Sequence, residues 1–397
     1  MSLPFRLGRR EAIGAMIKTL LKRAVTTALT SKTLRDFRRE QAARKRKRSG
    51  QAPTVLYFHD PADPYSQLTV QFLDRLSDRY AIEIQTHQVP PPIAAAAPEP
   101  ERLTEWSIRD AALLAKTYGL KPKAPAAVIK ALPKTNAETL AANGALREKL
   151  GHYLGATLYF EGEWYWGLDR LHYLETRLTD QGLDRQNGGP LFPPREIALD
   201  GPAAAPGPRA LDAFISFRSP YSYICLPRAK QLADHYGAEL RIRFVMPMVM
   251  RGLPVPRAKS WYITTDTKRE AERVGMRFGT IVDPVGLGVE RGLAVLHHAI
   301  QADKGYDFAL SFTQGAFADG IDATTDKGLI QMAKRAGLSA DQVKGALADE
   351  GWRKVAEDNR AEMFGCGLWG VPSFRVDDGP ARWGQDRLWA IEQDLKD

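Results

Sequence analysis

Ser219 occupies a position in this 397-residue chain where a side-chain hydroxyl can act on a bound anion. Residues 211–217 form a short, mostly apolar run, which predicts a buried strand. Ser219 and Pro220 interrupt that run, and from Tyr221 onward the apolar residues recur at helical spacing. Proline suits the first turn of a helix, because its missing N–H would have had no partner there. We therefore expect Ser219 beside the first free N–H groups of a helix, which favour an anion such as a thiolate or a carboxylate.

This strand, the run S-P-Y-S at residues 219–222 and the following helix resemble one branch of the DsbA-like thioredoxin superfamily. That branch contains the kappa-class glutathione transferases and the 2-hydroxychromene-2-carboxylate isomerases. Its disulfide-handling relatives have Cys-x-x-Cys at these four positions, whereas this chain has Ser219 and Ser222 at the two ends. The alternative is that Ser219 only caps the helix, because serine is a common N-cap residue.

Two later runs extend the resemblance over the second half of the chain: G-V-P-S-F at residues 370–374 and W-G-Q-D-R-L at residues 383–388. The resemblance implies a cis Pro372 that faces the helix start. It also implies glutathione as the cofactor, with the hydroxyl of Ser219 stabilising the glutathione thiolate. The main chain of Val371 would then pair with the cysteinyl part of glutathione. A simple loop proline is the alternative for Pro372.

The resemblance assigns the remaining ligands as well. Gln385 and Asp386, at the start of the last helix, would hold the γ-glutamyl end of glutathione, although both residues also suit simple helix capping. Lys259 would neutralise a carboxylate of glutathione or of the substrate. The aromatic residues Tyr221, Trp261 and Tyr262 would line the substrate site. A surface lysine beside core aromatic residues explains the segment around Lys259 equally well.

The function that the resemblance implies is that of a glutathione-dependent isomerase, or transferase, acting on an aromatic or conjugated oxo-acid. A thiol–disulfide oxidoreductase of the DsbA type needs a reactive cysteine at position 219, where this chain has serine. A DsbA-family protein without its redox cysteines and a non-catalytic, membrane-associated scaffold are the alternatives. The sequence leaves open whether the protein forms a homodimer.

The cysteine and histidine content limits the remaining chemistry. Only Cys225 and Cys366 occur, which excludes a disulfide framework and suits a reducing compartment, so we expect a cytoplasmic protein. Cys225 lies nearly two turns into the predicted helix and reads as a core thiol, and Cys366 reads as a loop residue. His297 and His298 have no suitably spaced partner, and we expect no metal site.

Charge is distributed unevenly along the chain. Residues 1–50 carry 15 Lys and Arg against 3 Asp and Glu, a net charge of +12; because the whole chain carries +9, the remainder carries 9 − 12 = −3. Residues 11–48 show helical periodicity with an apolar stripe. Three interpretations stay open for this basic amphipathic segment: a helix docked on the protein's own body, a helix on the inner face of a membrane, and an arm for nucleic acid. Nucleic acid is the partner that we expect least.

Sequence self-similarity predicts an α/β protein with two tandem thioredoxin-like domains, at residues 53–180 and 211–397, joined by a linker at 183–210. A shift of 156 positions places Phe58 on Phe214 and the run P-Y-S at residues 64–66 on residues 220–222. At the far end, W-G-L-D-R-L at residues 166–171 matches residues 383–388.

The two predicted domains differ in two respects. The second contains extra material, an inserted helical subdomain for which periodicity predicts helices at residues 289–301, 307–317, 325–336 and 340–347. The first has Asp63 in the place of Ser219 and, by our alignment, Thr157 in the place of Pro372. A carboxylate there would repel a thiolate, so we interpret the first domain as a degenerate, inactive copy.

Overall fold

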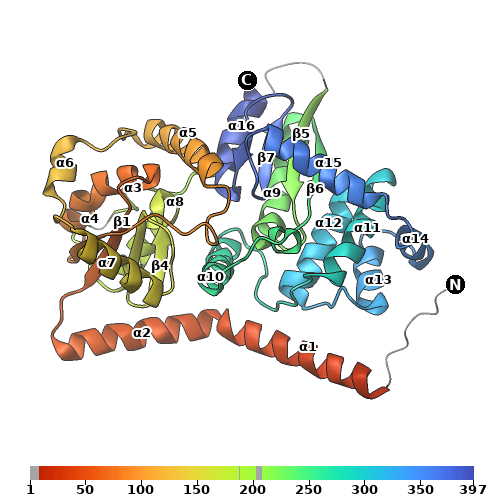
Figure 1. The fold of residues 1–397 in the computed structure, drawn as a ribbon, viewed down its shortest axis with the longest axis horizontal. Coiled ribbons are helices and arrows are strands. Elements are labelled where there is room, and N and C mark those ends of the chain that lie inside the picture. Colours follow the sequence, from red (N-terminus) through yellow and green to blue (C-terminus); the bar gives the residue numbers. More distant parts are fainter. Residues whose placement is uncertain (1–8, 187, 203–207) are drawn as a thin grey trace. The chain divides into compact units, whose positions relative to one another are not determined.

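The computed structural model describes residues 9–186, 188–202 and 208–397, with side chains described from residue 19 onward. The chain forms two compact units (Figure 1). The first, here called the Asp63 unit, comprises residues 35–196 and 253–263. The second, here called the Ser219 unit, comprises residues 1–34, 197–252 and 264–397. Each is a mixed α/β structure with its own four-stranded sheet.

The sheet of the Asp63 unit has the strand order β2-β1-β3-β4. The central strand β1 (Thr54–His59) runs parallel to β2 (Glu83–Gln88) and antiparallel to β3 (Thr157–Phe160), which pairs with β4 (Glu163–Trp166). The helical elements of this unit are α3 (Pro64–Thr69), η1 (Val70–Phe72), α4 (Leu73–Arg79), α5 (Pro100–Tyr118), α6 (Ala126–Ala131), α7 (Ala137–Lys149) and α8 (Gly167–Asp180).

The sheet of the Ser219 unit has the equivalent order β6-β5-β7-β8. The central strand β5 (Arg209–Ile215) runs parallel to β6 (Ala238–Phe244) and antiparallel to β7 (Ser373–Val376), which pairs with β8 (Arg382–Trp383). Helix α9 (Pro220–Tyr236) follows β5, as the sequence predicts. The chain continues through η2 (Met248–Arg251) and α10 (Arg257–Arg273), and it closes with η4 (Gln385–Arg387) and α16 (Leu388–Lys396).

A block of helices lies in the chain between β6 and β7. The four helices predicted there are present as α11 (Leu287–Gln301), α12 (Gly305–Gln314), α13 (Asp326–Arg335) and α14 (Ala340–Ala346), with a π-helical turn at Gly315–Asp319 and a further helix, α15 (Trp352–Gly365). The ring of Phe312 stacks on Phe217 with centroids 4.0 Å apart. A Cβ atom at Gly292 would lie 2.4 Å from the Phe312 ring, so this close packing requires glycine. The block is thereby fixed against the end of β5.

The two units share two tyrosine-to-carboxylate hydrogen bonds at equivalent positions. Tyr65 donates from its hydroxyl to Asp110 at 2.8 Å, and Tyr221 donates to Asp266 at 2.7 Å, with the partners 45 positions apart in both pairs. In the second equivalent bond a tyrosine donates to a glutamate, Tyr80 to Glu175 at 3.3 Å and Tyr236 to Glu392 at 2.8 Å. The two sheets therefore share their connecting contacts as well as their strand order.

The strand register corrects our assignment of Thr157 to the position of Pro372. Thr157 pairs with Phe58 on β1, and Ser373 pairs with Phe214 on β5. Thr157 is therefore the counterpart of Ser373, and the residue before it is the counterpart of Pro372. Sequence alone misplaced the match because the second hairpin is longer by one residue.

Ala156 is the residue that takes the place of Pro372. The carbonyl oxygen of Ala156 accepts a hydrogen bond from Gly167 N at 2.8 Å, and that of Pro372 accepts one from Gly384 N at 2.9 Å. Ala156 has a positive φ of 53°. The Asp63 unit thus keeps the main-chain contact of the hairpin but lacks the proline ring.

The basic N-terminal segment forms two helices, α1 (Arg9–Leu29) and α2 (Lys32–Ser49). Within the Ser219 unit, the Thr26 hydroxyl on α1 accepts from Ile281 N at 3.0 Å. Within the Asp63 unit, Arg39 on α2 donates twice to Glu163, at 2.7 Å each. Both helices therefore dock on the folded body, as the first of the three interpretations expects. Among the described residues, no helix is both long enough and apolar enough to cross a membrane.

Candidate functional site

Ser219 is the N-cap residue of α9. Its backbone is extended (φ −94°, ψ 111°), and its Oγ accepts a hydrogen bond from Ser222 N at 3.2 Å. Ser219 therefore caps α9, and its half-buried hydroxyl stands at the positive end of a 17-residue helix. Ser222 is fully buried, and its own Oγ accepts from Ser216 N at 3.3 Å, so this second serine serves the fold.

The loop before β7 brings Val371 and Pro372 to the same place. The peptide bond between Val371 and Pro372 is cis, as the resemblance implies. The Ser219 hydroxyl donates to the carbonyl oxygen of Val371 at 3.4 Å. In the described part of the chain, the N–H of Val371 has no backbone hydrogen-bond partner. A side-chain hydroxyl, a helix N-terminus and a main-chain edge therefore meet at one point.

Gly370 lets this loop lie against β8. A Cβ atom at Gly370 would fall 2.2 Å from Cζ2 of Trp383, closer than any side chain allows. The ring of Trp383 in turn packs against Trp369, with centroids 4.8 Å apart. The position of Val371 is therefore set by tight packing of the two residues before it against Trp383.

Gln385 and Asp386 lie in η4, which leads into α16. Gln385 is buried, and its side-chain amide donates to Glu270 Oε2 at 2.9 Å and to Asp386. Its amide oxygen accepts from Arg228. The polar atoms of Gln385 are thus used inside the protein, whereas Asp386 is half-buried.

Arg228 and Glu270 are two residues of this region that the sequence did not single out. Arg228 is on α9, nine positions after Ser219, and burial lowers the pKa of its guanidinium. Glu270 is on α10 and is fully buried, with an ion pair of 2.8 Å to Arg273. The only sequence signal for these two residues was a charged residue, Arg228, within the apolar stripe of α9. Their contacts leave no local pattern, because the partners are far apart in the chain.

Tyr221, a predicted substrate residue, directs its hydroxyl into the protein. The hydroxyl donates to Asp266 Oδ2 at 2.7 Å, and Asp266 is buried and also accepts from Arg269 at 2.9 Å. The ring of Tyr221 is half-buried. Tyr221 can therefore offer the edge or face of its ring to a ligand beside Ser219, while its hydroxyl supports α10.

The other three predicted ligands belong to a different unit from Ser219. Lys259, Trp261 and Tyr262 belong to residues 253–263 of the Asp63 unit. Lys259 Nζ donates to the carbonyl oxygen of Ala96 at 2.9 Å, and burial lowers the pKa of the Lys259 ammonium. The Trp261 side chain is 41% exposed.

Tyr262 departs furthest from its predicted role. Its side chain is buried in an apolar cluster with Phe58, Val89 and Trp164, and its ring meets His152 edge-on at 4.5 Å. A side chain packed in this way contacts no substrate without rearrangement. Tyr262 is therefore a core residue of the Asp63 unit, which is the alternative that the sequence left open.

Neither cysteine is placed for disulfide exchange at the start of α9. Cys225 is fully buried, its Sγ donates to Ser222 O at 3.2 Å, and burial raises the pKa of its thiol to about 12. Cys366 is half-buried at the end of α15 and accepts from Arg375 at 3.3 Å. Among the described residues, no three His, Cys, Asp or Glu side chains lie together as metal ligands do.

The counterpart of Ser219 in the Asp63 unit is a carboxylate with a similar structural role. Asp63 caps α3 by accepting from Tyr65 N at 3.2 Å and Ser66 N at 3.0 Å. Burial raises the pKa of Asp63 to about 6, and the nearby Asp60 adds to the rise. The Ser66 hydroxyl also donates to Asp63, at 2.9 Å, so the helix N-terminus and this hydroxyl together satisfy the carboxylate.

The second half of the chain matches a known protein family. Residues 210–396 match the model of the DSBA-like thioredoxin domain. These residues therefore form a DSBA-like thioredoxin domain, in which a serine stands at the N-terminus of α9 and a cis proline lies opposite.

Three solved structures of differently named proteins are among those similar to this chain. A 2-hydroxychromene-2-carboxylate isomerase is 18% identical over 47% of this chain and 94% of that chain, with a TM-score of 0.41. A probable DsbA oxidoreductase from Streptomyces coelicolor is 20% identical over 47% and 88%, with a TM-score of 0.36. The cytosolic disulfide reductase DsbM from Pseudomonas aeruginosa is 17% identical over 47% and 95%, with a TM-score of 0.36. No curated protein sequence matches the chain.

Proposed function

We propose that the Ser219 unit is a glutathione-dependent isomerase, or transferase, that acts on an aromatic or conjugated oxo-acid. The observation that carries this proposal is the position of the Ser219 hydroxyl, at the N-terminus of α9 and 3.4 Å from the carbonyl oxygen of Val371. A hydroxyl in this position can donate a hydrogen bond to a sulfur anion, and the helix end favours the same negative charge.

The residues at the thiol end fit glutathione. Ser219 is half-buried rather than enclosed, and Val371 has a main-chain N–H without a backbone partner. Val371 would pair with the cysteinyl part, and Asp386 and the main chain of η4 would meet the γ-glutamyl end. The side chain of Gln385 fits less well, because Arg228 and Glu270 already bind its amide. In this proposal Gln385 positions η4 instead of touching the ligand.

Bound glutathione supplies a thiolate nucleophile for reversible addition to a conjugated oxo-acid. The role of Ser219 is to keep the sulfur ionised by donating its single O–H. The role of Val371 and Pro372 is to fix the direction from which the sulfur approaches. Because Cys225 is buried and Cys366 lies at the end of α15, neither thiol stands at the start of α9 to form a mixed disulfide with glutathione. Return of glutathione gives an isomerase, and its retention on the product gives a transferase.

We also propose that the chain is a tandem of two thioredoxin-like domains, at residues 53–180 and 211–397, with the helices between β6 and β7 as an inserted subdomain. Equal strand order and the equivalent tyrosine–carboxylate bonds support a duplication. In the first copy, Asp63 would repel a thiolate where Ser219 would stabilise it. The second copy would therefore carry the activity alone.

Titration of the full-length protein with glutathione, followed by calorimetry, tests the proposal. Wild-type protein is expected to bind glutathione more tightly than S-methylglutathione, which cannot form a thiolate, and Ser219→Ala to lose that preference. Ser339→Ala is the matched control, because Ser339 caps α14 in the same way outside the site. With a conjugated oxo-acid as substrate, Ser219→Ala should lower the glutathione-dependent rate by about 10²–10³-fold. Equal binding of the two peptides to wild-type protein would overturn the proposal.

A further inference from the structure

Helix α1 turns its polar side toward the protein. Thr19 donates to Asp322 at 3.2 Å, Thr26 accepts from Ile281 N at 3.0 Å, and Thr27 lies 2.9 Å from the hydroxyl of Thr280. Residues 19, 23, 26 and 30 follow one another at helical spacing and share one side of the helix. The side that docks on the Ser219 unit therefore carries threonine hydroxyl groups and Arg23 instead of a leucine stripe.

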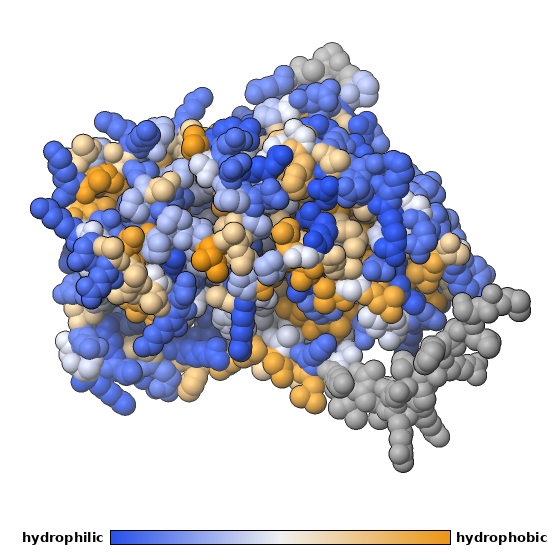
Figure 2. Space-filling view, viewed as in Figure 1, coloured by the Kyte–Doolittle hydropathy of each residue, from blue (hydrophilic) through white to orange (hydrophobic). Residues whose placement is uncertain are grey.

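The opposite side of α1 is apolar and faces solvent. The exposed fractions are 50% for Leu20, 60% for Leu21, 48% for Val25 and 37% for Leu29. Figure 2 shows a group of apolar side chains at the lower edge, in the region where the described end of α1 lies in Figure 1. A surface helix normally packs its apolar side on the core, so α1 has the reverse orientation. An apolar stripe of this kind marks an interaction surface.

Basic side chains accompany this stripe. Lys22 is exposed within it, and Lys32 is exposed directly after it. Residues 1–50 carry 15 Lys and Arg against 3 Asp and Glu. A partner that covers the leucines must therefore also be acidic.

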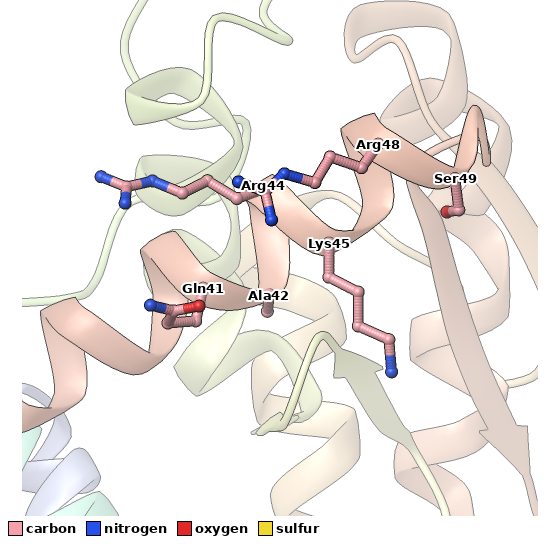
Figure 3. Close-up of a pocket in the computed structure, with 6 residues that line it drawn as sticks. All are labelled: Gln41, Ala42, Arg44, Lys45, Arg48 and Ser49. Atoms are coloured by element: carbon pink, nitrogen blue, oxygen red, sulfur yellow. The ribbon is translucent and has the colours of Figure 1, made fainter.

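Helix α2 separately presents basic residues that its docking contacts leave exposed. Arg39 and Arg46 are held in ion pairs of 2.7 Å with Glu163 and Glu161. A surface cavity of about 620 Å³ is lined by Gln41, Ala42, Arg44, Lys45, Arg48 and Ser49. Figure 3 shows the side chains of Arg44 and Arg48 extending from successive turns of α2. Arg44 also pairs with Glu40 on its own helix at 3.0 Å. The docking arginines and the exposed basic residues thus lie on different sides of α2, which gives the Asp63 unit a basic surface of its own.

We propose that α1 docks on the surface of an anionic lipid membrane. Leu20, Leu21, Val25 and Leu29 enter the boundary between headgroups and acyl chains, and the exposed Lys22 and Lys32 attract acidic headgroups. A second copy of this chain would bring another strongly basic segment against the first, which repels it. Nucleic acid would satisfy the basic residues but leave the leucines in water. An anionic bilayer matches both properties.

Flotation of the full-length protein with lipid vesicles tests this inference. The vesicles contain phosphatidylcholine alone or phosphatidylcholine mixed with phosphatidylglycerol. Wild-type protein is expected to float with the anionic vesicles only, and less at high salt. The double variant Leu21→Gln/Val25→Gln should lower the partition coefficient about tenfold or more. Its matched control is Ile108→Gln, which replaces an apolar side chain 56% exposed on α5 and should leave partitioning unchanged.

The electrostatic contribution is tested separately with Lys22→Gln/Lys32→Gln, two exposed lysines in the same unit as the leucines. Because a basic residue near an acidic surface contributes about a fivefold change in binding, the double variant should bind at least about tenfold more weakly. Lys344→Gln/Lys354→Gln, at exposed lysines of α14 and α15, is the control for charge alone. Circular dichroism confirms that each variant is folded.

Three results would overturn the inference. The first is failure of wild-type protein to float with anionic vesicles. The second is flotation of Leu21→Gln/Val25→Gln equal to that of wild type. The third is another partner for a protein that does not bind vesicles. That partner would be a nucleic acid whose binding tolerates Leu21→Gln/Val25→Gln, or a second copy of the chain in a dimer that this variant abolishes. Glutathione binding is measured in the same samples, so that loss of membrane binding is distinguished from loss of the proposed activity.

Discussion

The hydroxyl of Ser219 lies 3.4 Å from the carbonyl oxygen of Val371, although 152 residues separate them in the chain. The hydroxyl oxygen of Ser219 also accepts from Ser222 N at 3.2 Å. A serine has one O–H to donate, so a sulfur anion at this point would compete with the Val371 carbonyl for it. The acceptor role in the helix cap is not disturbed by that exchange. One residue can therefore cap α9 and serve a ligand at the same time.

The first prediction concerns the ionisation of bound glutathione. In Ser219→Ala, the pKa of the bound thiol should rise by about one to two units, because a hydrogen bond to a charged group contributes roughly 1.5–3 kcal/mol. The ultraviolet absorbance of the thiolate, followed against pH with saturating glutathione, measures this pKa. Ser339→Ala should titrate like wild type. Identical titration of Ser219→Ala and wild type would remove the serine from the mechanism.

The second prediction is that the activity does not depend on either cysteine. In the native protein a thiol reagent should label Cys366 and spare Cys225, whose thiol is buried and has a pKa raised to about 12. Mass spectrometry before and after unfolding in urea identifies the labelled residue. The double variant Cys225→Ala/Cys366→Ser should keep its glutathione-dependent rate within about twofold, at a stability cost of about 1 kcal/mol from the small cavity at Cys225. Loss of the rate in a folded variant would favour disulfide chemistry.

Local pattern was sufficient to predict the element that carries the candidate site. Strand β5 and helix α9 were both predicted, because an apolar run followed by Ser-Pro gives a buried strand and a helix start by purely local rules. Helix α15 was not predicted. Its buried residues Trp352, Ala356, Asn359 and Met363 keep helical spacing, but an asparagine and an alanine among them weaken the apolar signal.

Long-range partners set the limits of the sequence interpretation. The burial of Gln385 depends on Arg228 and Glu270, which come from two other helices. The core position of Tyr262 depends on Phe58 and Trp164, far away in the chain. Neither relationship leaves a trace in the spacing of neighbouring residues. The resemblance to a family correctly predicted the cis peptide bond between Val371 and Pro372, because that bond belongs to one short loop.

The third prediction concerns Gly370. Gly370→Ala places a Cβ 2.2 Å from the Trp383 ring, so the loop or the indole must move, and the free energy of unfolding should fall by about 1–3 kcal/mol. Urea unfolding measures the change. Gly345→Ala is the matched control, since its Cβ meets nothing within 4 Å inside α14, and it should be neutral or stabilising.

The partner of that contact supplies a second check. In the Trp383→Leu background, Gly370→Ala should cost less, because the indole atoms that clash with the new Cβ are gone. If the effects of the two substitutions on the free energy of unfolding are instead additive, the new Cβ at Gly370 is accommodated without contact with Trp383. Under the proposed function, Gly370→Ala should also weaken glutathione binding, because it displaces the adjacent Val371.

The fourth prediction is a pH dependence of stability in which two groups of the Asp63 unit act in opposite directions. Burial raises the pKa of Asp63 from 3.8 to about 6, so its contribution to stability is complete below pH 3.8 and is lost as pH rises through 6. Burial lowers the pKa of His59 from 6.5 to about 4, so its contribution is complete above pH 6.5 and is lost as pH falls through 4. Between these limits the two effects oppose each other.

Substitution of one group at a time should therefore reveal the other. In Asp63→Ser, which keeps an N-cap acceptor like that of Ser219, the free energy of unfolding should rise by about 2 kcal/mol relative to wild type as pH goes from 4 to 7. In His59→Gln it should fall relative to wild type over the same range, because Asp63 then acts unopposed. Urea unfolding at several pH values measures both differences. If the Asp63→Ser difference is constant with pH, the carboxylate is ionised in the folded state at pH 4, and hydrogen bonds from Tyr65 N and Ser66 N outweigh its burial.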